Sequence, residues 1–152
     1  MRLWLLAVGK GRAGPHRDLY DFYAQRLRWP VTLVEVEEKR KLAPAALKDR
    51  EAELLLGRLP AGATLCALDG TGKAESSAGL ATLLRRWQDN GITDLAFAIG
   101  GADGHGKELL NRAERKLSLG AMTWPHMLVR GMLAEQLYRA QQILAGHPYH
   151  RE

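Results

Sequence analysis

Short apolar runs that end in glycine-containing loops constrain the fold of this chain more than any other feature of its sequence. Three runs have the length and continuous hydrophobicity of strands that are buried on both faces: residues 3–8, 63–68 and 95–99. Two further strands are predicted at the β-branched segment 31–36 and near residues 116–119. Strands buried on both faces occur in parallel sheets, which need a crossover connection between successive strands.

Helical periodicity appears between these strands. Five helices are predicted. The first ends near Trp29 and Pro30 and has the periodic residues Leu19, Phe22, Tyr23, Arg26 and Leu27; the second covers residues 44–57; the third is capped by Ser76 or Ser77 and stops at Asn90; and the fourth covers residues 107–113. The fifth is a long helix from Pro125 with the apolar stripe Val129, Leu133, Leu137, Ala140 and Leu144. The alternation predicts an α/β fold, a parallel sheet flanked by helices, in one domain over residues 1–152.

The predicted topology brings four loops to one edge of the sheet. They follow Val8, Leu68, Ile99 and the short strand near residues 116–119, and three of them are rich in glycine. In open parallel sheets, ligands bind beyond the carboxyl ends of the strands. We therefore expect a single crevice built from these four loops.

Composition sets limits on partners and location. The chain has 22 Lys and Arg against 17 Asp and Glu, a net charge of +5, which favours a polyanionic partner such as nucleic acid. Its one cysteine rules out an internal disulfide and suggests the cytoplasm. The apolar run 3–8 is too short for a signal peptide or a membrane span. We therefore predict a cytoplasmic protein with no membrane partner.

Several common site chemistries fit poorly. Residues 101–107 match the phosphate-binding pattern G-x-x-x-x-G-K, but Glu108 follows where a magnesium-binding Ser or Thr is needed. The glycines at 100, 101 and 104 lack the spacing of a dinucleotide fingerprint. Cys66 lies inside an apolar strand, where it is expected to be a small buried hydrophobe. The five histidines are scattered, so no metal site is predicted.

The loop before the last helix suggests an adenine-bearing cofactor. It offers one side-chain hydroxyl, so a polar ligand there must bond mainly to backbone groups. A purine edge, a ribose and a sulfonium against an apolar wall would suit it, which points to S-adenosylmethionine. Its residues are Leu119, Gly120, Ala121, Met122, Thr123 and Trp124. Pro125 suits a first helical turn, and His126 and Arg130 share a face. The same loop would equally serve as ordinary core lining.

Six short motifs lie along the chain: residues 5–10 (LLAVGK), 68–73 (LDGTGK) followed by Ser76 and Ser77, 97–101 (FAIGG) with Gly104, 122–126 (MTWPH), 135–140 (EQLYRA) and 149–151 (YHR). In these motifs the chain resembles the bacterial ribosomal RNA large-subunit methyltransferase H family, of the SPOUT class. These motifs span the whole chain in the family's order.

This resemblance implies a C-terminal trefoil knot in the α/β fold and a homodimer. It also implies methylation of N3 of a pseudouridine in helix 69 of 23S ribosomal RNA, with S-adenosylmethionine as the methyl donor. The family's cofactor contacts fall on Leu68, on Gly100 and on the six loop residues from Leu119 to Trp124. These positions agree with the strand-end loops reached from the pattern of strands and helices.

Methylation at N3 needs a group that removes the imide proton or stabilises the resulting anion. The catalytic candidates are Tyr149, His150 and Arg151 in the tail, with Arg130 and His126 at the start of the last helix. Plain alternatives are that His126 bonds at the helix start and that Arg130 pairs with Glu135 or with phosphate.

Basic residues near the predicted edge are the candidates for contact with ribosomal RNA: Lys10, Arg12, Arg17 and Lys73. Each of them would equally serve as ordinary solvated surface. Two other functions stay open, a non-catalytic ribosome-binding or RNA-binding module and a nucleotide hydrolase that resembles the P-loop class.

Overall fold

A five-stranded parallel sheet forms the centre of the molecule. The structure is a computed structural model that describes residues 1–149. Its elements are β1 (Arg2–Val8), α1 (Pro15–Ala24), β2 (Val31–Val36), α2 (Pro44–Gly57), β3 (Thr64–Ala74), α3 (Ser77–Asp89), β4 (Asp94–Ile99), α4 (Lys107–Arg112), β5 (Arg115–Ser118) and α5 (His126–Leu144). The strand order is β2-β1-β4-β3-β5, and each neighbouring pair is parallel.

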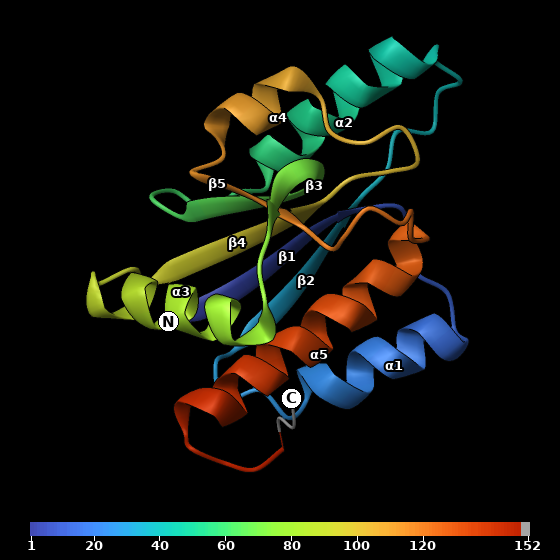
Figure 1. Ribbon diagram of the computed structural model, residues 1–152. Helices are drawn as coiled ribbons and strands as arrows, with labels where there is room; N and C mark the ends of the chain where they lie inside the picture. The colour runs from blue at the N-terminus through green and yellow to red at the C-terminus, as the bar shows by residue number, and fades with distance from the viewer. Residues whose placement is uncertain (150–152) are drawn as a thin grey trace.

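Helices cover both faces of this sheet (Figure 1). Side chains alternate along β1: Leu3, Leu5 and Ala7 join the core beneath α1, α3 and α5, whereas Leu6 and Val8 join the core beneath α2 and α4. Both cores contain residues without solvent exposure. The predicted α/β architecture and the buried central strands are therefore confirmed, while the trefoil knot stays a prediction.

One predicted loop is part of a strand. Residues 69–73 were expected as an exit loop, yet β3 runs to Ala74 and its register against β5 shifts between Leu68 and Lys73, which both lie opposite Leu117. The Asp69 carboxylate accepts a hydrogen bond from the Thr71 backbone N–H at 3.0 Å. This turn forms a bulge, after which the strand resumes its pairing.

Helix α1 lies against α5 at the position of a glycine. A Cβ atom placed on Gly131 would lie 2.7 Å from Cγ and Cδ2 of Leu19, closer than ordinary side-chain contacts. Gly131 is buried in the middle of α5, where glycine lowers helix stability by about 1 kcal/mol relative to alanine. The close packing of α1 on α5 explains this residue within one chain.

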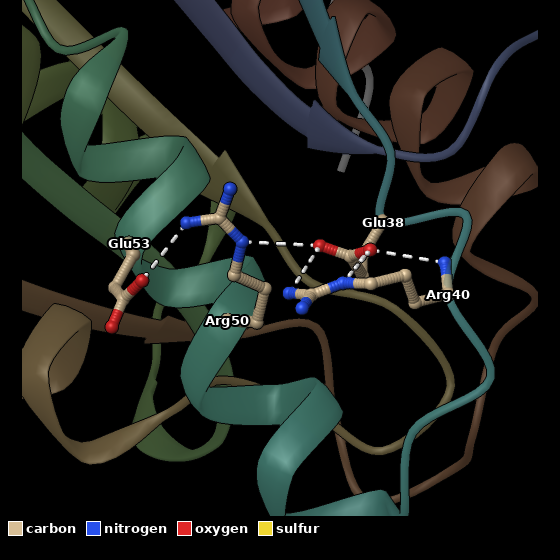
Figure 2. Close-up of polar contacts among 4 residues, drawn as sticks. All are labelled: Glu38, Arg40, Arg50 and Glu53. Carbon is tan, nitrogen blue, oxygen red and sulfur yellow. Dashed lines mark hydrogen bonds and ion pairs between the residues drawn. The ribbon is translucent and has the colours of Figure 1, made fainter.

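The connection from β2 to α2 is organised by one carboxylate (Figure 2). Glu38 accepts hydrogen bonds at 2.9 Å from Nε and from the backbone N–H of Arg40, and at 3.0 Å from Nε of Arg50. Hydrogen bonds from Arg40, and then from Arg50, lower the pKa of Glu38 to about 2. Arg50 also bonds Glu53, so the network ties the loop to the first turns of α2. Across residues 1–149, no helix is long and apolar enough to cross a membrane.

Candidate functional site

A cavity of about 640 Å³ opens at the carboxyl edge of the sheet, between the bulge of β3, the ends of β4 and β5, and the start of α5. We call it the main cavity. Its lining comprises Leu68, Asp69, Gly70, Ile99, Gly100, Gly101, Ala102, Gly104, His105, Leu117, Ser118, Leu119, Gly120, Ala121, Met122, Thr123, Trp124, Pro125, His126 and Val129. All eight residues proposed as cofactor contacts lie in this lining.

The loop after β4 is tightly folded at the wall of the main cavity. Gly101 and Gly104 form an isolated bridge, with the Gly104 N–H donating to the Gly101 carbonyl at 3.1 Å. A Cβ on Gly100 would lie 3.1 Å from the Gly104 carbonyl carbon and 3.2 Å from Nδ1 of His105. A larger residue at position 100 must therefore displace this loop or enter the cavity.

The loop of residues 119–124 is closed by its own hydrogen bonds. The hydroxyl of Ser118 bonds the backbone N–H and carbonyl of Gly120, both at 3.2 Å, and Nε1 of Trp124 donates to the Leu119 carbonyl at 3.3 Å. Met122 is 74% exposed and forms an apolar part of the rim. Backbone groups and apolar side chains thus dominate this wall, which is the chemistry that the sequence predicted.

His105 is a buried wall residue that the sequence reasoning missed as part of the site. Its Nε2 donates to the Ala98 carbonyl at 3.1 Å, and the ring is 6% exposed. Burial lowers the pKa of His105 and outweighs the hydrogen bond with Ala98, which would raise it. The ring is therefore neutral near pH 7. The sequence did hold a signal for this role: Gly104 and Gly106 on either side have no side chains, so His105 is the one side chain of this triplet that can pack into the wall.

A second cavity of about 320 Å³ lies beside the main one, at the connection from β1 to α1. Its lining is Lys10, Gly11, Arg12, Ala13, Gly14, Pro15, His16, Arg17, Tyr20, Leu33, Met127 and Arg130. The loop after Val8 was expected to share one crevice with the other three loops. That expectation was wrong, because residues 10–14 line this second cavity instead.

Arg130 anchors the loop that separates β1 from α1. Its guanidinium donates from Nη1 to Oε2 of Glu35 at 2.5 Å and from Nη2 to the carbonyl of Gly9 at 2.7 Å. The same Glu35 oxygen accepts the backbone N–H of Gly11 at 2.5 Å. Arg130 therefore pairs with Glu35 and not with Glu135, whose ion-pair partner is Arg139 at 2.5 Å.

His126 lies between the two cavities. It lines the main cavity, while the next residue, Met127, lines the second. A Cβ on Gly9 would lie 3.0 Å from Cε of Met127 and 3.4 Å from Nε2 of His126, so both side chains rest on the end of β1. Burial, and then the charge of Arg130, lower the pKa of His126, which leaves a neutral imidazole near pH 7.

The described part of the C-terminal tail lies away from the main cavity. Tyr149 packs edge-on against Tyr138, with ring centroids 4.9 Å apart, and its hydroxyl donates to Oε1 of Glu135 at 3.3 Å. Burial, a hydrogen bond with Tyr23 and the charge of Glu135 raise the pKa of Tyr149. His150 and Arg151, the other two tail candidates, lie outside the described residues.

The four candidate RNA contacts fall into two places. Lys10, Arg12 and Arg17 line the second cavity, whereas Lys73 forms an ion pair with Glu75 at 3.2 Å near the end of β3 and lines neither cavity. Cys66 is fully buried in β3, and burial raises the pKa of its thiol to about 12. Within residues 1–149, no group of three His, Cys, Asp or Glu side chains could hold a metal ion.

Comparison with known proteins gives a consistent result. A family model described as a predicted SPOUT methyltransferase matches residues 1–150. A protein of Rhodospirillum centenum named ribosomal RNA large subunit methyltransferase H is 58% identical, with 99% of each chain covered. Proteins with the same name from Paramagnetospirillum magneticum and Rhodospirillum rubrum are 59% and 57% identical, again with 99% of each chain covered.

Proposed function

The chain belongs to the SPOUT methyltransferase family, and from this premise we propose that it methylates 23S ribosomal RNA with S-adenosylmethionine as the donor. The proposed target is N3 of a pseudouridine in helix 69. One observation carries the proposal: the bulge of β3 and the loops after β4 and β5 enclose a single cavity with a largely backbone and apolar wall, in a chain that is similar throughout its length to ribosomal RNA methyltransferases. A ribosomal substrate agrees with the cytoplasmic location expected from the sequence.

The residues of the main cavity fit this donor. A volume of about 640 Å³ is within the range of cofactor sites, and the missing Cβ of Gly100 lets this part of the wall pack closely against Gly104 and His105. We propose that backbone groups of Leu68, Gly100 and residues 119–124 hold the adenosine and methionine parts. Asp69 and Ser118 are the polar side chains beside them. S-adenosylmethionine supplies an electrophilic methyl group.

The chain's own contribution is orientation and management of one proton. The cavity walls hold the methyl donor and the target nucleobase in line, which lowers the entropic cost of methyl transfer. N3 loses its imide proton as the new bond forms, so a neutral acceptor or an anion-stabilising group must face it. His126 meets this requirement among the described candidates, since it lines the main cavity and has a lowered pKa.

Arg130 is better suited to positioning than to contact with the base. Its guanidinium is buried and already bonded to Glu35 and to the end of β1. We propose that it fixes the loop of Lys10 and Arg12, and that these two side chains meet the RNA backbone. Tyr149, His150 and Arg151 stay predicted tail contributors, and the homodimer stays part of the proposal.

Calorimetry tests the donor assignment first. Purified protein is titrated with S-adenosylmethionine and, in parallel, with ATP and magnesium. We expect saturable binding of the former alone, lost in Gly100→Val because the valine side chain would clash with Gly104 and His105 and displace this wall of the main cavity. Methyl transfer to large ribosomal subunits, followed with a labelled methyl group, then tests the reaction. Binding of ATP and magnesium alone would support the nucleotide hydrolase instead, and RNA binding without methyl transfer would support the non-catalytic module.

A further inference from the structure

We propose that the second cavity binds one nucleotide of the RNA substrate, with its phosphate at the β1–α1 loop and its base on the apolar floor. This inference rests on the proposed function and adds a binding site to it. The cavity is separate from the main cavity, and its volume of about 320 Å³ is at the lower limit for a small-molecule site.

Its entrance carries an excess of positive charge. Lys10, Arg12 and Arg17 line it, and all three are exposed. Arg17 forms an ion pair with Asp21 at 3.4 Å, but no ion pair engages Lys10 or Arg12 anywhere in the described chain. Two cations are thus available to a phosphate.

Carboxylates near the second cavity do not cancel this charge. Glu35 lies behind the β1–α1 loop, where its carboxylate already accepts hydrogen bonds from Arg130 and from the backbone N–H of Gly11. Asp18 is exposed in the first turn of α1 and is absent from the lining, as is Asp21. The lining itself holds only positive or neutral side chains.

The N-terminus of α1 also favours an anion in this cavity. This helix has ten residues, Gly14 precedes it, and no side chain caps its N-terminus. Uncapped N–H groups and the positive end of the helix dipole attract anions. Gly14 and Pro15 both line the cavity, so the open helix end and the free cations meet at one place.

A buried cation lies deeper in the cavity. Arg130 is 4% exposed, and its Nε has no hydrogen-bond partner in the structure. Its other two nitrogens are held by Glu35 and the Gly9 carbonyl, so Arg130 fixes a positive charge beneath the loop that carries Lys10 and Arg12.

The remaining floor of the second cavity is apolar. Tyr20 is buried, and Leu33 and Met127 complete the wall. Burial raises the pKa of Tyr20 to about 12, so its ring carries no charge near neutral pH. An aromatic ring and a thioether sulfur both pack well on a nucleobase. Because Met127 follows His126, a nucleotide held here would neighbour the group proposed to face N3.

Calorimetry with uridine 5′-monophosphate as the probe tests this inference. We expect the wild type to bind it at least about tenfold more tightly than uridine or inorganic phosphate, because both the phosphate and the base contribute. Arg12→Glu should weaken binding at least about tenfold. The control is Arg58→Glu, which reverses an exposed charge at the end of α2, beyond the opposite edge of the sheet, and should bind as the wild type does.

Saturating S-adenosylhomocysteine locates the probe. We expect it to leave binding of the monophosphate unchanged, since it would occupy the main cavity. Displacement would place the probe in the main cavity and overturn the inference. Equal affinity for inorganic phosphate, equal affinity in Arg12→Glu, or no binding would overturn it too. Binding of S-adenosylmethionine and methyl transfer by the wild type are measured separately, so a failure here is distinct from failure of the proposed function.

Discussion

At the residue scale, Glu35 is the clearest link between sequence and site. It lies on β2, yet it neutralises Arg130 on α5 and accepts the N–H of Gly11, so one carboxylate joins three segments. Burial opposes ionisation of Glu35, but the Gly11 amide and Arg130 outweigh burial and lower its pKa below 4.5. Neither partner was visible in the sequence, because Gly11 reaches Glu35 through the parallel pairing of β1 with β2 and Arg130 reaches it from α5, 95 residues along the chain.

Glu35→Gln should therefore destabilise the fold. Loss of the carboxylate leaves the buried Arg130 guanidinium without its counter-charge, and we expect a loss of about 2 kcal/mol at pH 7 in urea denaturation. The control, Glu53→Gln, removes an exposed partner of Arg50 and should cost less than about 0.5 kcal/mol. Equal losses in the two variants would contradict the argument.

The same comparison has a predicted dependence on pH. A carboxyl whose pKa is lowered by folding stabilises the native state above its unfolded pKa, near 4.5, and loses this contribution as pH falls through the folded value. The difference between wild type and Glu35→Gln should be constant from pH 7 to pH 5 and should shrink below about pH 4. A difference that persists unchanged at pH 3 would show that packing, not charge, causes the loss.

Gly131 gives a second prediction at this scale. Gly131→Ala adds a methyl group against Leu19, and we expect the packing strain to exceed the helix-propensity gain, for a net loss of about 1 kcal/mol. In the control Gly57→Ala the new Cβ meets nothing within 4 Å, so that variant should be neutral or more stable. Thermal unfolding of both measures the contrast, and stabilisation by Gly131→Ala would disprove the close contact.

At the scale of elements, hydrophobic periodicity predicted all five strands and the order of the helices. It succeeded because strands such as β4 are buried along their whole length, which leaves a continuous apolar run. The bulged end of β3 was missed, since the polar sequence from Asp69 to Lys73 is typical of a turn and its pairing with β5 is a tertiary contact. The division into two cavities was missed for a similar reason: the start of α5 lies between the β1 loop and the other three, and only the packing reveals this.

The C-terminal tail yields a prediction for a whole segment. Deletion of residues 149–152 should abolish methyl transfer while leaving the dissociation constant for S-adenosylmethionine within about twofold of the wild type, because Tyr149 does not line the main cavity. Retained donor binding also serves as the control for folding. Near-normal turnover in the truncated protein would remove the tail from the catalytic machinery.

At the scale of the whole molecule, we propose that a third cavity is where the second copy of the proposed dimer sits. It measures about 500 Å³ and lies along α1, α3 and α5. Its lining includes the partly exposed Met132 and, at one end, Leu119 and Gly120, which also line the main cavity. A second copy seated here would press on the back of the loop that we propose holds the donor, so dimer formation and donor binding should be coupled.

Met132→Glu tests this coupling. The groove already carries the carboxylates of Glu75 and Glu135, and a third one at Met132 would be costly to bury against a partner. The wild type should therefore sediment at twice the chain mass of 16.9 kDa and the variant at the single mass. The monomer should also bind S-adenosylmethionine more weakly, since Leu119 and Gly120 lose their support. Ala45→Glu, on exposed surface of α2 across the sheet, is the matched control and should remain dimeric. A dimeric Met132→Glu would place the interface elsewhere, and a monomeric variant with unchanged donor affinity would separate assembly from the loop.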